Sequence, residues 1–293
     1  MGFHFLVIIA FIHLAVGGSC HASLPGEVHW KSVFPNTPIP KNLQDLLQPE
    51  SKDNLFKVAN ANEHPSSFLY SLRLGYRTVY FFETHLRPGT RTKPRLMKTT
   101  NKATFLPREV ANSIPFSSDK FPEILEHFSV EPKSKEAKVM KRTIDDCEGA
   151  AIKGEDKYCV TSFESLVDSS VSRLGKKIQV LPNEADTETK TKDFTIGEGV
   201  QNMGEKQVVC HKTNYPYAVF LCHSFEKTNT YSVPLVGSDG TKAKAVAICH
   251  KDTSAWNPKH SAFKQLNVKP GTVPICHFLT TETIVWVPKY SKL

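Results

Sequence analysis

The sequence predicts an α+β fold, with helices first and then a mainly antiparallel β-sheet or barrel. Two observations support this prediction. Apolar residues recur at helical spacing before residue 176, whereas after it they form short runs separated by turn residues. The second half also carries four adjacent Cys-His pairs along these runs. The chain has 293 residues, 40% of them hydrophobic, which is enough for at least one sizeable core.

Residues 1–22 have the features of a secretory signal peptide. Phe3 to Val16 form an apolar run that is too short to span a bilayer, and small residues precede a cleavage point after Ala22. No later apolar run approaches the length of a transmembrane helix. We therefore expect entry into the secretory pathway and no membrane span in the mature chain.

Residues 23–66 are predicted to form an extended, proline-containing arm and a linker, ahead of a domain over 67–293. Three prolines between 35 and 40 exclude a helix there. Residues 41–47 allow one or two amphipathic turns, and residues 50–66 are polar, as in a linker. Trp30 is expected to dock on the domain.

The first part of the domain is predicted to contain a strand over 79–82, a turn over 86–90 and three helices. One helix begins near Pro122 and a second covers 135–143. The third is the clearest: Thr161 and Glu164 have the spacing of a capping box, and Gly175 fits the C′ position.

Strands dominate after residue 176, with an exposed loop predicted within 178–193 and a hairpin turn at 237–240. A short helix is predicted with Asn257 as its cap and Pro258 as its first residue. The predicted strands are 178–181, 194–196, 207–210, 217–222, 231–236, 243–249 and 284–287.

Removal of the signal peptide leaves an even number of cysteines, which favours three disulfides in an oxidising compartment. These cysteines are Cys147, Cys159, Cys210, Cys222, Cys249 and Cys276. Their order along the chain permits fifteen pairings. Cys147 and Cys159 do not have the spacing of a zinc knuckle, so a disulfide that closes this local loop is favoured.

The histidines of the four pairs are candidate metal ligands. Neighbouring side chains of a strand point to opposite faces, so the Cys and His of one pair cannot readily bind the same ion. The candidates are His211, His223, His250 and His277, with His260 in the short helix as a fifth. Imidazoles without thiolates suit Zn(II), Ni(II) or Cu(II), and Cu(II) best.

The alternative is that the histidines serve only packing or hydrogen bonding, but four of them at a repeated position favour metal binding. Binding would weaken as the pH falls through about 6.5, because imidazole must be neutral. A hydrolase is disfavoured, since the chain has no Gly-x-Ser-x-Gly motif. No catalytic residue is assigned.

The formal net charge is +8, and the largest local excess of basic residues lies within 87–108. This stretch is either a solvated loop or a contact for an anionic polymer or surface. Since the chain carries no RNA- or DNA-binding signature, we do not expect a nucleic-acid partner.

The four pairs follow the pattern C-H-x10-C-H-x25-C-H-x25-C-H-x8-W, which ends at Trp286. This pattern resembles that of the plant BURP-domain family. Further similarities are Phe81-Phe82, residues 105–108, 114–118, 215–219 and 252–256, and together they cover roughly residues 78–290. Trp30 and the prolines at 35–38 resemble the unknown-seed-protein-like branch.

The resemblance implies a secreted, cell-wall or storage-vacuole plant protein with a role in seed development or stress response. It implies a BURP fold in which disulfides join the cysteines and the histidines form copper centres. The expected partners are cell-wall or vacuolar matrix components, or a peptide substrate. Whether the chain is an enzyme stays open.

Some members of the family are copper- and dioxygen-dependent peptide cyclases that crosslink Tyr or Trp in a core peptide of their own chain. The corresponding stretch here, residues 91–104, contains no aromatic residue. The resemblance therefore leaves two hypotheses: a metal-binding protein without enzymatic activity, and a cyclase that acts on another segment or another peptide.

Overall fold

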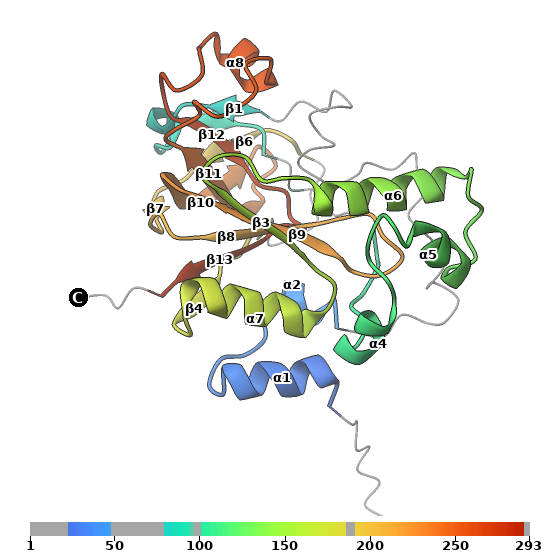
Figure 1. The fold of residues 1–293 in the computed structure, drawn as a ribbon. Coiled ribbons are helices and arrows are strands. Elements are labelled where there is room, and N and C mark those ends of the chain that lie inside the picture. Colours follow the sequence, from blue (N-terminus) through green and yellow to red (C-terminus); the bar gives the residue numbers. More distant parts are fainter. Residues whose placement is uncertain (1–22, 48–78, 95, 97–100, 186–190, 290–293) are drawn as a thin grey trace, which may run out of the picture.

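The structure is a computed structural model, and it describes residues 23–47, 79–94, 96, 101–185 and 191–289. The predicted signal peptide over 1–22 and linker over 50–66 lie outside the described residues. Two antiparallel sheets form the centre of the molecule, and helices surround them (Figure 1). The predicted α+β class is confirmed, with the strands divided between two sheets.

The larger sheet has eight strands, and its main path runs β1-β12-β11-β10-β6-β2. In addition, β5 pairs with β11, and β7 pairs with β10. The hairpin between β10 and β11 turns at residues 237–240, as predicted. The strands are β1 (Tyr80–Phe81), β2 (Arg91–Thr92), β5 (Glu184–Ala185), β6 (Phe194–Ile196), β7 (Gln201–Asn202), β10 (Thr228–Gly237), β11 (Lys242–His250) and β12 (Ile275–Phe278).

The smaller sheet has five strands in the order β3-β9-β8-β13-β4. It faces the larger sheet through a shared cluster of buried aliphatic side chains, which includes Val209 and Val285 from one sheet and Val246 and Ile248 from the other. Its strands are β3 (Glu155–Val160), β4 (Ile178–Val180), β8 (Val208–Lys212), β9 (Phe220–Phe225) and β13 (Ile284–Pro288).

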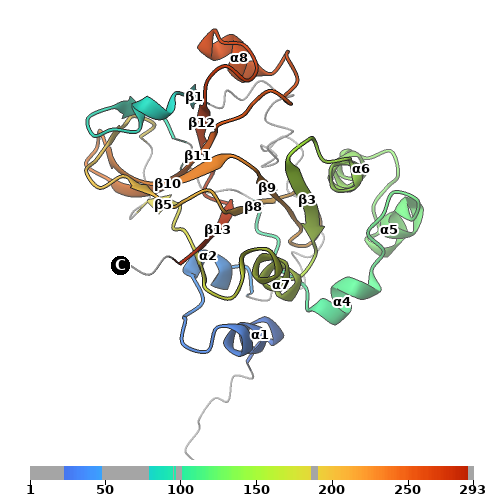
Figure 2. The ribbon, with the colours of Figure 1, turned by 60° about the vertical axis from the view of Figure 1, so that its left-hand side comes forward.

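Helices α1, α2 and α7 cover the outer face of the smaller sheet (Figure 2). Helix α7 packs on the smaller sheet, where Phe163 and Leu166 are buried with Val208 and Trp286. Helices α4 to α6 form a second cluster with the β8–β9 connection. The helices are α1 (Pro25–Val33), α2 (Lys41–Gln44), α4 (Arg108–Ser113), α5 (Phe121–His127), α6 (Lys135–Glu148), α7 (Phe163–Leu174) and α8 (Ser261–Leu266), with the 3-10 turn η2 (Glu83–His85).

The N-terminal arm is not wholly extended, because it contains helix α1. Pro25 occupies the first turn, where a missing N–H costs nothing, and the Glu27 carboxylate accepts a hydrogen bond from the Leu24 amide. The helix buries Trp30, which is 2% exposed and lies 6.0 Å from the Trp286 ring. Docking of Trp30 is therefore confirmed, and burial of its side chain explains why a helix forms there.

Several predicted boundaries require correction. Helix α6 continues beyond residue 143 to Glu148, where Cys147 is tied to Cys159. Strands β3 and β12 were not predicted, because β3 begins with three charged residues and β12 follows a proline. Part of the predicted loop within 178–193 forms β5. Asn183 beside it is buried, and its side-chain amide donates a hydrogen bond to the Thr280 carbonyl and accepts one from the Val246 amide.

The cap of helix α7 lies one residue later than predicted. The Ser162 hydroxyl accepts a hydrogen bond from the Ser165 amide, and the Ser165 hydroxyl accepts one from the Ser162 amide, both at 3.1 Å. These two hydrogen bonds show that Ser165, and not the predicted Glu164, is the reciprocal partner of the cap residue. Ser162 itself is buried, with 1% of its surface exposed. Gly175 ends the helix with a φ of 82°, as predicted.

This shift in the cap can be tested. Ser162→Ala is expected to lower the free energy of unfolding by about 1 kcal/mol, because an amide of the first turn loses its acceptor. Thr161→Ala is the matched control and should have a smaller effect. Urea unfolding followed by circular dichroism measures both, and a larger loss at Thr161 would restore the original assignment.

The basic stretch over 87–108 is partly described. Lys93 pairs with Asp193 at 3.1 Å, and Arg108 pairs with Asp168. Two of its charges are therefore offset by carboxylates from distant parts of the chain. Among the helices of the described residues, none is long and apolar enough to cross a membrane.

Candidate metal centre

The four Cys-His pairs lie in strands β8, β9, β11 and β12. The sheet register places Cys210 opposite Cys222, and Cys249 opposite Cys276, and both pairs form disulfides. Cys147 and Cys159 form the third. The predicted three disulfides are thus present, and the strand register selects the pairing of the two that join strands.

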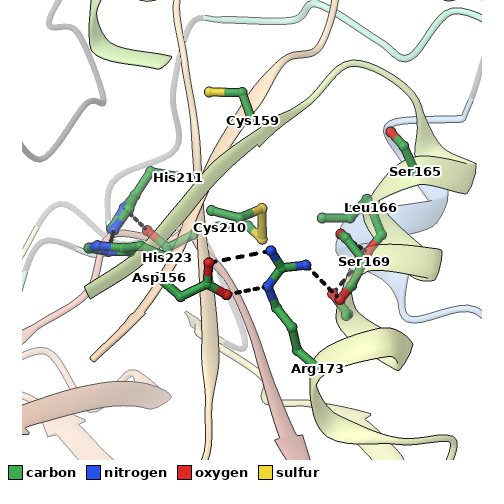
Figure 3. The surroundings of a disulfide bond; sticks show 12 residues. Asp156, Cys159, Ser165, Leu166, Ser169, Arg173, Cys210, His211 and His223 are labelled. Atoms are coloured by element: carbon green, nitrogen blue, oxygen red, sulfur yellow. Dashed lines mark hydrogen bonds and ion pairs between the residues drawn. A yellow bond between two sulfur atoms is a disulfide. The ribbon is translucent and has the colours of Figure 1, made fainter. Parts of the chain in front are cut away.

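Because side chains alternate along a strand, the histidine after each cysteine points to the opposite face. Figure 3 shows this for the first two pairs: His211 and His223 point toward each other, away from the Cys210 disulfide. Cys210 and Cys222 are buried beside α7, whereas Cys249 and Cys276 belong to a core cluster within the larger sheet. The disulfides and the imidazole rings therefore lie on opposite faces of the same strands.

All four histidines line one small cavity between the two sheets. Their exposed fractions lie between 4% and 7%. The cavity volume is about 10 Å³, which is room for about one water molecule or a single ion. The other lining residues are Gln207, Val209, Ser224, Phe225, Ile248 and Leu279.

The histidines form two close pairs. The Nε2 atoms of His211 and His223 lie 3.2 Å apart, and the rings of His250 and His277 are stacked with centroids 5.6 Å apart. Phe225 contacts both pairs, with its centroid 5.1 Å from His223 and 5.1 Å from His250. Within the part of the chain that the structure describes, no group of three or more His, Cys, Asp or Glu side chains has the arrangement of a metal site.

In each of the four rings, Nδ1 lies next to an oxygen. Thr283 Oγ1 is 3.3 Å from His211 Nδ1, and Glu155 Oε1 is 3.0 Å from His223 Nδ1. Thr228 Oγ1 lies 3.4 Å from His250 Nδ1, and the Phe278 carbonyl 3.3 Å from His277 Nδ1. An oxygen at one ring nitrogen orients the imidazole and leaves Nε2 as the nitrogen that can bind a metal.

Burial keeps most of these imidazoles neutral. It lowers the pKa of His211 and of His250 well below 6.5, and the neighbouring histidines add to the effect. Burial also lowers the pKa of His277 to about 4. A neutral imidazole is the form that binds a metal.

Glu155 does not line the cavity but contacts the Nδ1 side of the His223 ring, and its side chain is 11% exposed. Burial alone would raise its pKa, but hydrogen bonds from His223 and the Ile152 amide outweigh burial and lower the pKa. The carboxylate therefore stays ionised and accepts the Nδ1–H of His223. Sequence patterns could not identify Glu155, because it lies 68 residues from His223 in a strand with no apolar alternation.

The fifth candidate, His260, does not line the cavity with the other four. The short helix begins at Ser261 rather than at Pro258, and the Nδ1 of His260 accepts a hydrogen bond from the Ala262 amide as its cap. The Trp256 ring contacts both His260 and the cavity residue His250, with its centroid 4.7 Å from that of His260 and 5.0 Å from that of His250. Burial lowers the pKa of His260 as well.

Comparison with known proteins places this arrangement in a family. Residues 79–288 match the model of the BURP domain. The chain is 53% identical to BURP domain protein RD22 of Arabidopsis thaliana over 215 residues, which are 71% of this chain and 55% of RD22. It thus spans about half the length of that relative.

Other relatives match over nearly their whole length. BURP domain-containing protein 5 of Oryza sativa subsp. japonica is 38% identical over 94% of this chain and 90% of its own. Embryonic abundant protein VF30.1 of Vicia faba is 33% identical over 99% of this chain and 97% of its own. The four Cys-His pairs, their register and these matches show that the chain belongs to the plant BURP-domain family.

Proposed function

We propose that this chain is a secreted or vacuolar BURP-domain protein that binds copper through its four cavity histidines and acts in seed development or the stress response. The observation that carries the metal proposal is the oxygen beside each Nδ1, since metal-binding histidines typically have such a partner. Imidazole donors without thiolate suit Cu(II).

The spacing of the first histidine pair supports the same proposal. Two nitrogens held about 2.0–2.1 Å from one ion at a tetrahedral angle lie about 3.3 Å apart. The observed separation of 3.2 Å is close to this value, although it also permits a hydrogen bond between the rings of the metal-free protein. The bound metal would supply a link between the two sheets and a redox-active centre.

The chain's own residues have distinct roles in this proposal. His211 and His223 would hold the metal from the smaller sheet, and His250 and His277 from the larger one. Glu155 is a positioning residue, because its carboxylate orients the His223 ring. Thr228 and Thr283 do the same for His250 and His211 with hydroxyl oxygens.

Burial favours binding without catalysis over the cyclase alternative. A peptide cannot enter a cavity of about 10 Å³ whose histidines are at most 7% exposed. Three disulfides agree with an oxidising compartment, which supports the secretory route. The name of VF30.1, a relative matched over 97% of its length, supports a role in seeds.

Metal titration of the metal-free protein, produced in a secretory host, tests the proposal. Wild type is expected to bind Cu(II), and His211→Gln with His250→Gln should abolish binding because each pair loses one ligand. Glu155→Gln should weaken binding about 10–100-fold, since His223 loses its anionic partner. The matched control is His127→Ala, an exposed histidine outside the cavity.

Intact disulfides and unchanged circular dichroism would show that each variant is folded. Copper content and peptide mass then decide between a metal-binding protein without enzymatic activity and a cyclase. Copper content that is the same in wild type and in the double variant would contradict the metal site. A peptide lighter by two hydrogens after incubation with copper and dioxygen would favour the cyclase instead.

A further inference from the structure

The N-terminal arm (residues 23–47) lies against the domain through a buried aromatic contact. In α1, Trp30 has its ring centroid 6.1 Å from that of Phe163 in α7 and 6.0 Å from that of Trp286 in β13. Phe34, four residues after Trp30, stacks on Trp286 with the centroids 6.5 Å apart. Figures 1 and 2 both show α1 beside α7. We call Phe163 and Trp286 the docking face.

Polar contacts surround this aromatic centre. His29 Nε2 lies 2.7 Å from Asp168 Oδ1, and Arg108 donates a hydrogen bond to the other oxygen of the same carboxylate. The Phe105 amide donates to the Leu46 carbonyl at 2.9 Å. An apolar centre with a polar rim is the usual arrangement of an interface between two separate proteins. The arm therefore meets the domain as one binding partner meets another.

The arm also makes contacts within itself. Trp30 Nε1 donates a hydrogen bond to the Thr37 carbonyl at 2.7 Å, so the buried indole N–H needs no partner from the domain. The Trp30 and Phe34 rings lie 4.7 Å apart. The two ends of the arm touch as well, because a Cβ atom on Gly26 would lie 2.5 Å from the Leu47 side chain. These contacts make the arm a compact segment that carries its own anchors.

The arm lies outside the domain whose residues it covers. The BURP-domain match begins at residue 79 and includes both residues of the docking face, whereas the arm ends at Leu47. Amphipathic helices with apolar anchors at positions i and i+4 are a common form of peptide ligand. A covalent connection raises the effective concentration of such a ligand at its binding site.

We propose that the docking face is a recognition site for an amphipathic helical peptide with Trp and Phe four residues apart, and that the arm is its tethered ligand. Once the chain is cut between residues 48 and 78, a free peptide with the same anchors replaces the arm. The inference does not depend on the copper site, because the docking face belongs to the cluster beside α7 and the histidine cavity lies between the sheets.

A protease cleavage sequence inserted within residues 50–66 of the full chain tests the inference. After cutting, a fluorescently labelled peptide of residues 23–47 is added in excess, and its anisotropy and the circular dichroism of the protein are measured. The cut protein is expected to stay folded and to bind the peptide. The uncut protein should not bind it, because the tethered arm occupies the docking face.

Trp30→Ala in the peptide should weaken binding about 30-fold, because the central aromatic anchor is lost. Val28→Ala is the matched control on the same helix, since Val28 is 56% exposed, and it should leave the affinity unchanged. Equal weakening by the two substitutions would overturn the assignment of the anchors.

Three other outcomes would overturn the inference. A cut protein that unfolds, or that keeps its own arm against excess peptide, would make the arm an integral part of the fold. A cut protein that is folded but binds no peptide would leave the docking face without a recognition role. Equal binding to cut and uncut protein would place the peptide at a different surface.

Discussion

Lowering the pH from 7 to 4 is expected to reduce the free energy of unfolding of the metal-free protein by at least about 3 kcal/mol. The pKa of His277 is lowered from 6.5 to about 4 by burial. Each pKa unit corresponds to about 1.4 kcal/mol, and His277 alone accounts for the stated figure. His211 and His250 are shifted in the same direction and should enlarge the loss.

Stability falls as the pH falls because the unfolded chain binds more protons than the folded chain over part of this pH range. Above pH 6.5 the imidazole of His277 is neutral in both states, so it contributes no pH dependence. Between pH 6.5 and about 4 the unfolded chain takes up a proton that the folded chain does not, and stability falls as the pH falls. Below about pH 4 both states are protonated, and this contribution becomes constant.

Urea unfolding at intervals between pH 7 and 4 measures the effect. His277→Gln replaces the titrating ring with an amide, and its stability should depend less steeply on pH by about 3 kcal/mol over the same range. A wild-type stability that stays constant from pH 6.5 to 4.5 would contradict the buried, neutral state of these rings.

Removal of the Cys249–Cys276 disulfide is expected to lower the free energy of unfolding by about 3.5 kcal/mol. The two cysteines are separated by 27 residues, so the crosslink restricts a long segment of the unfolded chain. Both are fully buried, and the truncated side chains of Cys249→Ala with Cys276→Ala would leave a small cavity that adds to the loss.

The same variant should also weaken copper binding, because the disulfide holds β11 and β12 together in the register that places His250 and His277 side by side. Cys147→Ala with Cys159→Ala is the matched control: its separation of 12 residues predicts a loss of about 2.8 kcal/mol, with copper affinity unchanged. Urea unfolding and copper titration measure both quantities. Equal copper affinities in the two double variants would contradict a role of the register in the site.

Sequence reasoning was most accurate where local chemistry determines the structure. The apolar face and Gly175 identified helix α7, and turn residues identified the β10–β11 hairpin. It failed where a distant partner overrides local preference. Strand β3 begins with charged residues and forms because it pairs with β9 and carries Cys159. Helix α1 forms where Trp30 can be buried against Trp286.

By itself, the sequence determined that cysteines and histidines serve different faces, because side-chain alternation is a property of every strand. Only the tertiary structure decided which cysteines pair, since the register depends on contacts between strands far apart in the chain. It also decided that the imidazoles form two pairs in one cavity, that Glu155 and Gln207 accompany them, and that His260 caps a helix instead. These features arise at the interface between the two sheets, and local sequence patterns do not determine which strands meet there.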